Sequence, residues 1–209
     1  QGGGMFVWGD EGGLIRVVGE LTFDNCQSQN QGGGLFLICN GAESNIQVSG
    51  HLNFDNCSAY SSGGGLHLHI SLGGSIILDN KCDFLKCKSG NGGAMYLDIN
   101  FEEYQAFQIK DILIQECYAL INTESSFYSQ SGFGGGIFIT GTGVYDISSK
   151  MLDFSKMKTY GNSADKAGQS LYVAMPNVIE CSPTTRINPP SSPHTNIPPP
   201  QLFVEQFIN

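Results

Sequence analysis

The feature that most limits what this chain can fold into is a repeated segment, of which residues 52–68 (LNFDNCSAYSSGGGLHL) are the clearest copy. One landmark of the repeat is a cysteine, and Cys26, Cys57, Cys87 and Cys117 are spaced 31, 30 and 30 residues apart. A period near 30 over five or six copies is typical of a repeat protein, in which a unit buries its apolar face only by stacking on its neighbours.

The second landmark is an aliphatic residue that follows a run of glycines or small residues. It begins a short apolar segment at Met5, Leu35, Leu66, Met95, Ile137 and Leu171. This residue comes nine positions after Cys26 and after Cys57, and Leu171 comes nine positions after Asn162. The spacing therefore predicts that Asn162 takes the place of the cysteine in the last copy.

Within each copy, apolar and polar residues alternate, as in Leu52-Asn-Phe54 and Leu66-His-Leu68. A two-residue period is typical of strands, and no stretch has a persuasive helical period. We expect three short strands per copy, separated by bends at Gly19, Gly50 and Asn80 and by the glycine runs. This pattern predicts an all-β fold, a right-handed parallel β-helix of about five to six coils over residues 1–175.

In such a solenoid the coils lie about 4.8 Å apart, so equivalent residues form ladders along the axis. The predicted core ladders are Leu21, Leu52, Cys82 and Ile112; Phe23, Phe54, Phe84 and Ile114; and Leu37, Leu68, Leu97, Ile139 and Val173.

The repeats resemble those of the chlamydial polymorphic outer-membrane proteins, which carry Gly-Gly-Ala-aliphatic and Phe-x-x-Asn motifs. The matching residues are Gly92-Gly93-Ala94-Met95, Gly63-Gly64-Gly65-Leu66 and Asn162-Ser163-Ala164, and the resemblance covers roughly residues 2–175. It implies a pectin-lyase-like solenoid exported to a cell surface and often adhesive. One departure is that four copies have a cysteine where the family motif has asparagine.

Composition narrows the choice of partners and cofactors. The chain has 209 residues, a charged fraction of 14% and a formal net charge of −9. A nucleic-acid partner would require a basic stripe, so the charge argues against one. Neither a C-x-x-C motif nor a His-spaced zinc pattern occurs, and we expect no metal, no cofactor and no transmembrane segment.

The cysteines leave two alternatives open. Cys26, Cys57, Cys87 and Cys117 could form disulfides between adjacent coils, since 4.8 Å lies within the usual Cα separation. They could equally be free thiols that pack as small hydrophobic side chains. The total of seven leaves at least one cysteine unpaired within the chain. Asn56-Cys57-Ser58 is also a possible glycosylation sequon at Asn56, although a buried Cys57 would hinder its use.

The two ends differ in character from the repeats. The chain starts within a copy, so we expect a partner or upstream coil to cover the first sheet edge. Residues 176–200 are rich in proline, which predicts a tail or linker. Residues 201–209 form an apolar docking segment, and we expect it to pair with a sheet edge of the same or the next chain, through Leu202, Phe203, Val204, Phe207 and Ile208.

The best catalytic candidates are His67, His69 and Asp98, on the outward side of one predicted wall. The ladder register places His69 beside Asp98 and His67 beside Tyr96, within reach for acid–base chemistry. Alternating polar residues on a solvated strand face produce such neighbours routinely, and this interpretation is favoured.

The outward positions of the glycine-led strands form a stripe of five aromatic residues and one histidine: Phe6, Phe36, His67, Tyr96, Phe138 and Tyr172. Such a stripe exceeds the scattered apolar residues of ordinary surfaces, and it predicts a face that binds a protein or a glycan. Stacking along the ladder, or burial under the tail, is the structural alternative.

These observations favour a noncatalytic extracellular or cell-surface β-helix that is structural or adhesive and forms homo-oligomers or filaments by stacking of coils or docking of the tail. The alternative is a polysaccharide lyase or hydrolase on the same fold, since fold alone does not separate the two.

Overall fold

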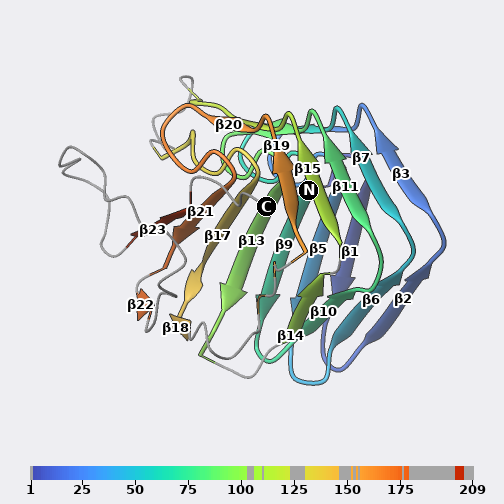
Figure 1. The fold of residues 1–209 in the computed structure, drawn as a ribbon. Coiled ribbons are helices and arrows are strands. Elements are labelled where there is room, and N and C mark those ends of the chain that lie inside the picture. The colour runs from blue at the N-terminus through green and yellow to red at the C-terminus, as the bar shows by residue number, and fades with distance from the viewer. Residues whose placement is uncertain are drawn as a thin grey trace.

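The structure is a computed structural model that describes residues 2–102, 106–109, 111–122, 130–145, 152, 154, 156–175, 177–178 and 201–204, with backbone only at 106, 145, 177, 178 and 201–204. The described residues are all β, without a helix, and form a parallel β-solenoid of about five coils with a period near 31 residues. Figure 1 shows the coils stacked from β1–β4 at one end to β21 at the other.

Four parallel sheets make the walls of the solenoid, and we name each wall after its first strand. The β1 wall contains β1 (Met5–Gly9), β5 (Leu35–Asn40), β9 (Leu66–Ser71), β13 (Met95–Asn100), β17 (Ile137–Thr142) and β21 (Leu171–Ala174). The β2 wall contains β2 (Leu14–Val18), β6 (Asn45–Ser49), β10 (Ser75–Leu78) and β14 (Ala106–Ile109). The β3 wall contains β3 (Leu21–Asp24), β7 (Leu52–Asp55), β11 (Cys82–Leu85), β15 (Ile112–Gln115) and β19 (Lys158–Tyr160). The β4 wall contains β4 (Gln27–Ser28), β8 (Ser58–Ala59), β12 (Lys88–Ser89), β16 (Tyr118–Ala119) and β20 (Ser163–Ala164).

Three further strands complete the fold. β18 (Val144–Tyr145) pairs with β22 (Asn177–Val178), and β23 (Gln201–Val204) adds to the β1 wall. β23 runs antiparallel to β21, with Leu171 opposite Val204 and Val173 opposite Leu202.

The structure confirms the predicted ladders. Leu21 pairs with Leu52, Leu52 with Cys82, and Cys82 with Ile112. The same three pairings place Phe23, Phe54, Phe84 and Ile114 in one row. Leu37, Leu68, Leu97, Ile139 and Val173 form the third row. All three ladders belong to one continuous core, at whose edge Leu21 is partly buried.

The prediction of three strands per coil was wrong, because each regular coil has a fourth, two-residue strand on the β4 wall. Two residues separate it from the β3 wall, and the first of them has the left-handed conformation: Asn25, Asn56, Lys86 and Glu116 have φ angles between 49° and 54°. This conformation turns the chain sharply and is unfavourable for most side chains, though asparagine tolerates it. The corner therefore lies directly before the cysteine of each repeat.

The glycine runs are required by close packing between coils. A Cβ atom on Gly64 would lie 2.2 Å from the carbonyl oxygen of Gly93 in the next coil. A Cβ on Gly65 would lie 2.7 Å from the ring of Phe84. In the next coil Ile114 replaces the phenylalanine, and Ala94 replaces the glycine. The Ile114 side chain is smaller than phenylalanine and thus leaves room for the methyl group of Ala94.

Candidate functional site

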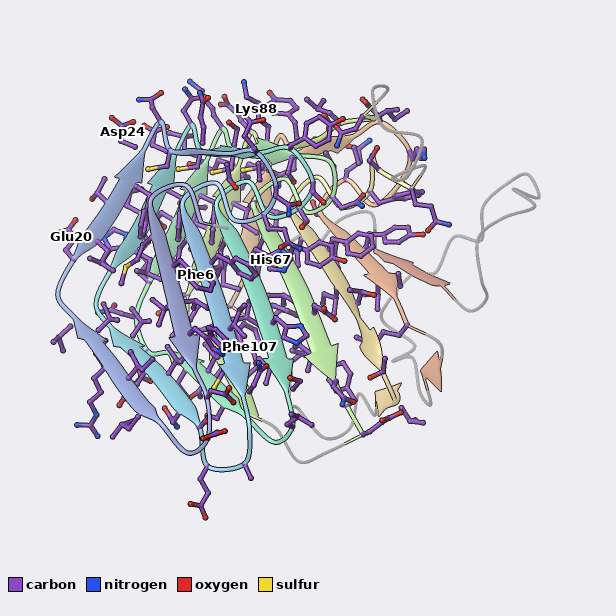
Figure 2. All side chains as sticks on the ribbon, turned by 180° about the vertical axis from the view of Figure 1, so that it is seen from behind. Phe6, Glu20, Asp24, His67, Lys88 and Phe107 are labelled. Carbon is purple, nitrogen blue, oxygen red and sulfur yellow. The ribbon has the colours of Figure 1, made fainter. Side chains whose placement is uncertain are left out.

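The predicted aromatic stripe exists as a ladder on the outer side of the β1 wall. In register along the axis are Phe6, Phe36, His67, Tyr96, Phe138 and Tyr172. Neighbouring rings are in contact throughout, with centroid separations between 4.6 and 5.3 Å. The row of rings crosses the front sheet in Figure 2, which labels Phe6 and His67. The structural alternative, in which the rings stack along the ladder, therefore describes this row.

The expectation that this stripe is an exposed contact face was wrong. Phe36, His67, Phe138 and Tyr172 are buried, with exposed fractions of 6%, 3%, 8% and 2%, and Tyr96 is partly buried. Phe6 alone in the ladder reaches 37%. The sequence pattern gave the side of the sheet on which these rings lie, but not what covers them.

The cover is the turn that precedes each glycine run, folded back over the outer side of the strand. One residue of each turn forms a bridge to the next coil, in the row Gln31, Ser62, Asn91, Phe133 and Ala167. The Phe133 ring lies 4.6 Å from the Tyr172 ring, and both belong to a small apolar cluster with Phe138 that is separate from the main core. A second, satellite core therefore lies on the outer side of the β1 wall.

His67 is a structural member of this satellite core. Its Nδ1 atom lies 2.9 Å from the Ser62 hydroxyl, and its ring stacks on Tyr96 with centroids 4.8 Å apart. Burial lowers the pKa of His67 from 6.5 to about 3, because charging the ring would require desolvation. Burial also raises the pKa of Tyr96, and the nearby Asp98 carboxylate adds to that effect. His67 is therefore neutral and enclosed.

His69 and Asp98 form the predicted pair. His69 Nδ1 lies 2.9 Å from Asp98 Oδ2, and the two side chains are 35% and 38% exposed. The structure thus divides the candidate catalytic set: His69 and Asp98 lie together at the surface, whereas His67 lies under the turn that contains Ser62. A partly exposed His–carboxylate pair can bind a substrate or transfer a proton.

A second histidine cluster was missed in the sequence. His51 Nε2 donates a hydrogen bond of 2.9 Å to Asp83 Oδ2, and Lys81 Nζ lies 2.7 Å from the same oxygen. His51 Nδ1 lies 3.8 Å from Glu20 Oε1. Glu20, His51 and Lys81 are spaced 31 and 30 residues apart, so the repeat period could have identified them as one ladder. Among the described residues, no group of three or more His, Cys, Asp or Glu side chains is placed to hold a metal ion.

The cysteine ladder consists of free thiols. Cys26, Cys57, Cys87 and Cys117 are all unpaired, as are Cys39 and Cys82, while Cys181 lies outside the described residues. The side-chain hydrogen bond with the Cys87 thiol of the next coil and burial in the core both raise the pKa of Cys57 far above its ordinary value. Burial, aided by the Asp83 carboxylate, raises the pKa of Cys82 to about 12. Of the two alternatives, the described structure therefore has free thiols that pack between the coils.

The substitution of asparagine by cysteine in the repeat has a physical explanation. Asn162 Nδ2 donates a hydrogen bond of 3.3 Å to the Ile114 carbonyl of the preceding coil. Cys57 Sγ lies 3.2 Å from the carbonyl oxygen of Phe23 in the preceding coil, and Phe23 holds the position equivalent to Ile114. Either side chain can donate to the preceding coil, so cysteine keeps this one of the two hydrogen bonds of asparagine, whose Oδ1 also accepts from the Cys117 N–H.

Asn56 and the C-terminal segment complete the predicted site residues. Asn56 is exposed and donates a 2.6 Å hydrogen bond to Asn25 Oδ1, whereas the neighbouring Cys57 is fully buried. Glycosylation of Asn56 stays a prediction. Leu202, Phe203 and Val204 lie in β23, which pairs with a sheet edge of the same chain. Phe207 and Ile208 lie outside the described residues, as does most of the Pro-rich segment, so the role of this region in assembly also stays a prediction.

The described part of the chain contains no helical segment with the length and hydropathy of a membrane span. No protein-family model matches the chain, and comparisons with curated proteins and with solved structures gave no match.

Proposed function

We propose that this chain is a noncatalytic β-helix of the extracellular space or cell surface, with a structural or adhesive role. The observation that carries the proposal is that equivalent residues of successive coils pack on one another along the solenoid. The Phe23–Phe54–Phe84 rings stack at 4.7 to 4.9 Å, and the outer ladder stacks at similar separations. Even His67, the most chemically versatile residue of the outer ladder, is taken into this packing.

The surface location is supported by the resemblance of the repeats to those of the chlamydial polymorphic outer-membrane proteins. Gly92-Gly93-Ala94-Met95 matches the Gly-Gly-Ala-aliphatic motif, and a Cβ on Gly93 would approach the Gly135 carbonyl oxygen to 2.2 Å. A motif with this packing role suits a stable rod that presents its walls to partners outside the cell.

Self-association through the ends of the solenoid is a further part of the proposal. Leu14 and Val18 on β2 are 60% and 77% exposed, and β1 to β4 have one unpaired edge each among the described strands. Exposed edges and apolar side chains are suitable for pairing with another coil. The proposed product is a homo-oligomer or filament.

The second candidate is a polysaccharide-acting enzyme, and the His69–Asp98 hydrogen bond is the specific observation that favours it. In such an enzyme His69 would act as the general base or acid, with Asp98 orienting its ring. His67 has no part in this candidate, since it is buried and its pKa is about 3.

Turnover assays on acidic and neutral polysaccharides separate the two candidates. We expect no product above background from the unaltered chain or from a His69→Gln, Asp98→Asn double variant. As a matched control, Asn100→Asp and Thr142→Val alter the polar row farther along the same wall. Product formation by the unaltered chain and the control, lost in the double variant, would overturn the noncatalytic proposal.

A further inference from the structure

A second outward row on the β1 wall lies next to the aromatic ladder and differs from it in exposure. Its members in register are Trp8, Ile38, His69, Asp98 and Thr140. Trp8 is 58% exposed and is the sole tryptophan of the chain. Together with Phe6 at 37%, it places two exposed aromatic side chains on the outer face of β1.

The charged side chains on the described β1-wall strands and the turns that follow them have one sign. The β1-wall strands and the turns that follow them carry five carboxylates and neither lysine nor arginine: Asp10, Glu11, Glu43, Asp98 and Glu102. Asp10, Glu11, Glu43 and Glu102 are exposed. Asp10 follows Trp8 by two residues and lies one residue past the end of β1, where its Oδ1 accepts a hydrogen bond from the Glu11 N–H.

Most of the described basic residues lie on other parts of the solenoid. Arg16, Lys81, Lys86, Lys88 and Lys158 lie on or beside the strands of the β2, β3 and β4 walls. Lys166 lies over the Phe133 ring, near the opposite end of the stack from β1. Figure 2 labels Lys88 on the upper rim, away from Phe6 on the front sheet. The turns that follow β1 and β5, at residues 10–13 and 41–44, therefore carry three carboxylates and neither lysine nor arginine.

We infer that the outer face of β1, around Trp8, docks a lysine- or arginine-bearing segment of a partner protein. The inference rests on the proposed noncatalytic binding role and names the chemistry of its partner. An indole is the best aromatic acceptor for a cation–π contact, and the exposed carboxylates Asp10 and Glu11 lie in the turn that directly follows the strand of Trp8.

Charge complementarity selects this partner over other ligands of an aromatic face. An anionic polysaccharide or a nucleic acid would be repelled by the carboxylates around Trp8. An uncharged glycan could stack on the indole but would gain nothing from the charge of the surrounding turns. A cationic segment gains from both the ring and the carboxylates, and these also speed its approach.

The experiment titrates the full chain with a peptide that has alternating lysine and glycine and no aromatic residue, while the fluorescence of Trp8 is recorded. Since Trp8 is the sole tryptophan, the signal reports on this face directly. An uncharged hexasaccharide and a serine version of the peptide are the comparison ligands. We expect saturable fluorescence change with the lysine peptide, weakened by about ten-fold or more between about 0.02 M and about 0.2 M salt.

Two charge-matched variants locate the contact. Asp10→Asn, Glu11→Gln, Glu43→Gln removes three charges beside Trp8, and Asp24→Asn, Asp55→Asn, Glu116→Gln removes three charges from the β3 wall and its corner. The first should weaken binding by about ten-fold, whereas the second should change it less than about two-fold. Trp8→Ala, followed with a labelled peptide, should weaken binding by about two- to five-fold. Circular dichroism should show unchanged strand content for all three.

Three results would overturn the inference. These are no response to the lysine peptide, equal weakening by both triple variants, or salt-independent binding of the hexasaccharide in its place. A failed peptide titration leaves the noncatalytic proposal intact, because that proposal is tested separately by polysaccharide turnover. Turnover, conversely, would remove the noncatalytic proposal without altering the peptide result.

Discussion

Two aromatic ladders run along this solenoid, and they differ in how uniform they are. In the inner ladder, Phe54 stacks on Phe23 and Phe84 with interplanar angles of 9° and 3°. In the outer ladder the angle is 56° between Phe6 and Phe36 and 79° between Phe36 and His67, and 2° between Tyr96 and Phe138. The inner rings lie against glycine residues, and this close packing allows only one ring orientation. The outer rings lie under turns in which the covering residue differs from coil to coil.

This difference shows that the side of a sheet on which a residue lies does not determine its exposure. Tyr172 lies outside the main core and is 2% exposed, while Trp8, two positions along its strand from the aromatic row, is 58% exposed. The covering turn reaches the first outward row of the β1 wall but not the second. Packing therefore takes the first outward row of this face, and the second outward row is left more exposed.

The largest expected effect is loss of the inner stacking by Phe54→Ala. Phe54 is fully buried between two parallel rings, so its removal should lower the free energy of unfolding by about 3–5 kcal/mol. Denaturant titration measures this value. Phe6→Ala in the outer ladder, where the ring is 37% exposed, is the control and should cost much less. Equal costs would remove the distinction between the ladders.

The packing of glycine against phenylalanine can be tested in the coil where the chain has Ala94 and Ile114 instead. Ile114→Phe places a ring against the methyl group of Ala94 and should cost about 1–3 kcal/mol by overpacking. Adding Ala94→Gly restores the pair found in Gly65 and Phe84, and should recover much of that loss. Unfolding free energies of the two single variants and the double variant give the coupling between the sites. Simple additivity would contradict the account.

Acidification tests the burial of His67 in the outer ladder. The pKa of His67 is about 3 in the folded state against its ordinary value of 6.5, so between these values the unfolded state binds a proton that the folded state does not. Its contribution to stability is complete above pH 6.5 and should fall by about 1 kcal/mol between pH 6.5 and about pH 5.5.

A His67→Phe variant isolates this contribution, since it keeps a ring between Phe36 and Tyr96 and removes the titration. The difference in unfolding free energy between the two proteins should therefore change with pH in this window. A difference that is independent of pH would mean that water reaches the His67 ring.

The smallest expected effect on stability, but a clear chemical one, concerns the thiols. Alkylation of the denatured chain without reductant should label at least the six described cysteines. In the folded chain Cys26, which is partly exposed, should be labelled before Cys57, Cys87 and Cys117, which are fully buried. Mass spectrometry of the peptides measures the order. Disulfide-linked peptides from adjacent coils would contradict the thiol ladder.

The ladders were predictable from the sequence because one period and one alternation determine every register. A repeat of about 30 residues places Phe54 beside Phe23, and a two-residue strand period places Leu66 and Leu68 on one side. The pairing of His69 with Asp98 follows from the same arithmetic. Such features depend only on spacing, which a sequence displays directly.

The corner residues and the covering turns were not predictable in the same way. Lys86 and Glu116 adopt the left-handed conformation, for which their side chains give no signal, because the coils around them impose it. The burial of His67 depends on the path of the turn that contains Ser62, and turns lack a two-residue alternation. The sequence therefore predicted which residues neighbour one another, but not which outward rows are covered.

Hydroxyl-radical footprinting of the folded chain tests the central claim most directly, because it measures the exposure of aromatic side chains on both outward rows at once. We expect rapid oxidation of Trp8 and Phe6, and protection of Phe36, Phe138 and Tyr172, relative to the same residues in the denatured chain. Oxidation of Phe36, Phe138 and Tyr172 at rates near those of the denatured chain would show that the outer ladder is open, and would contradict the account.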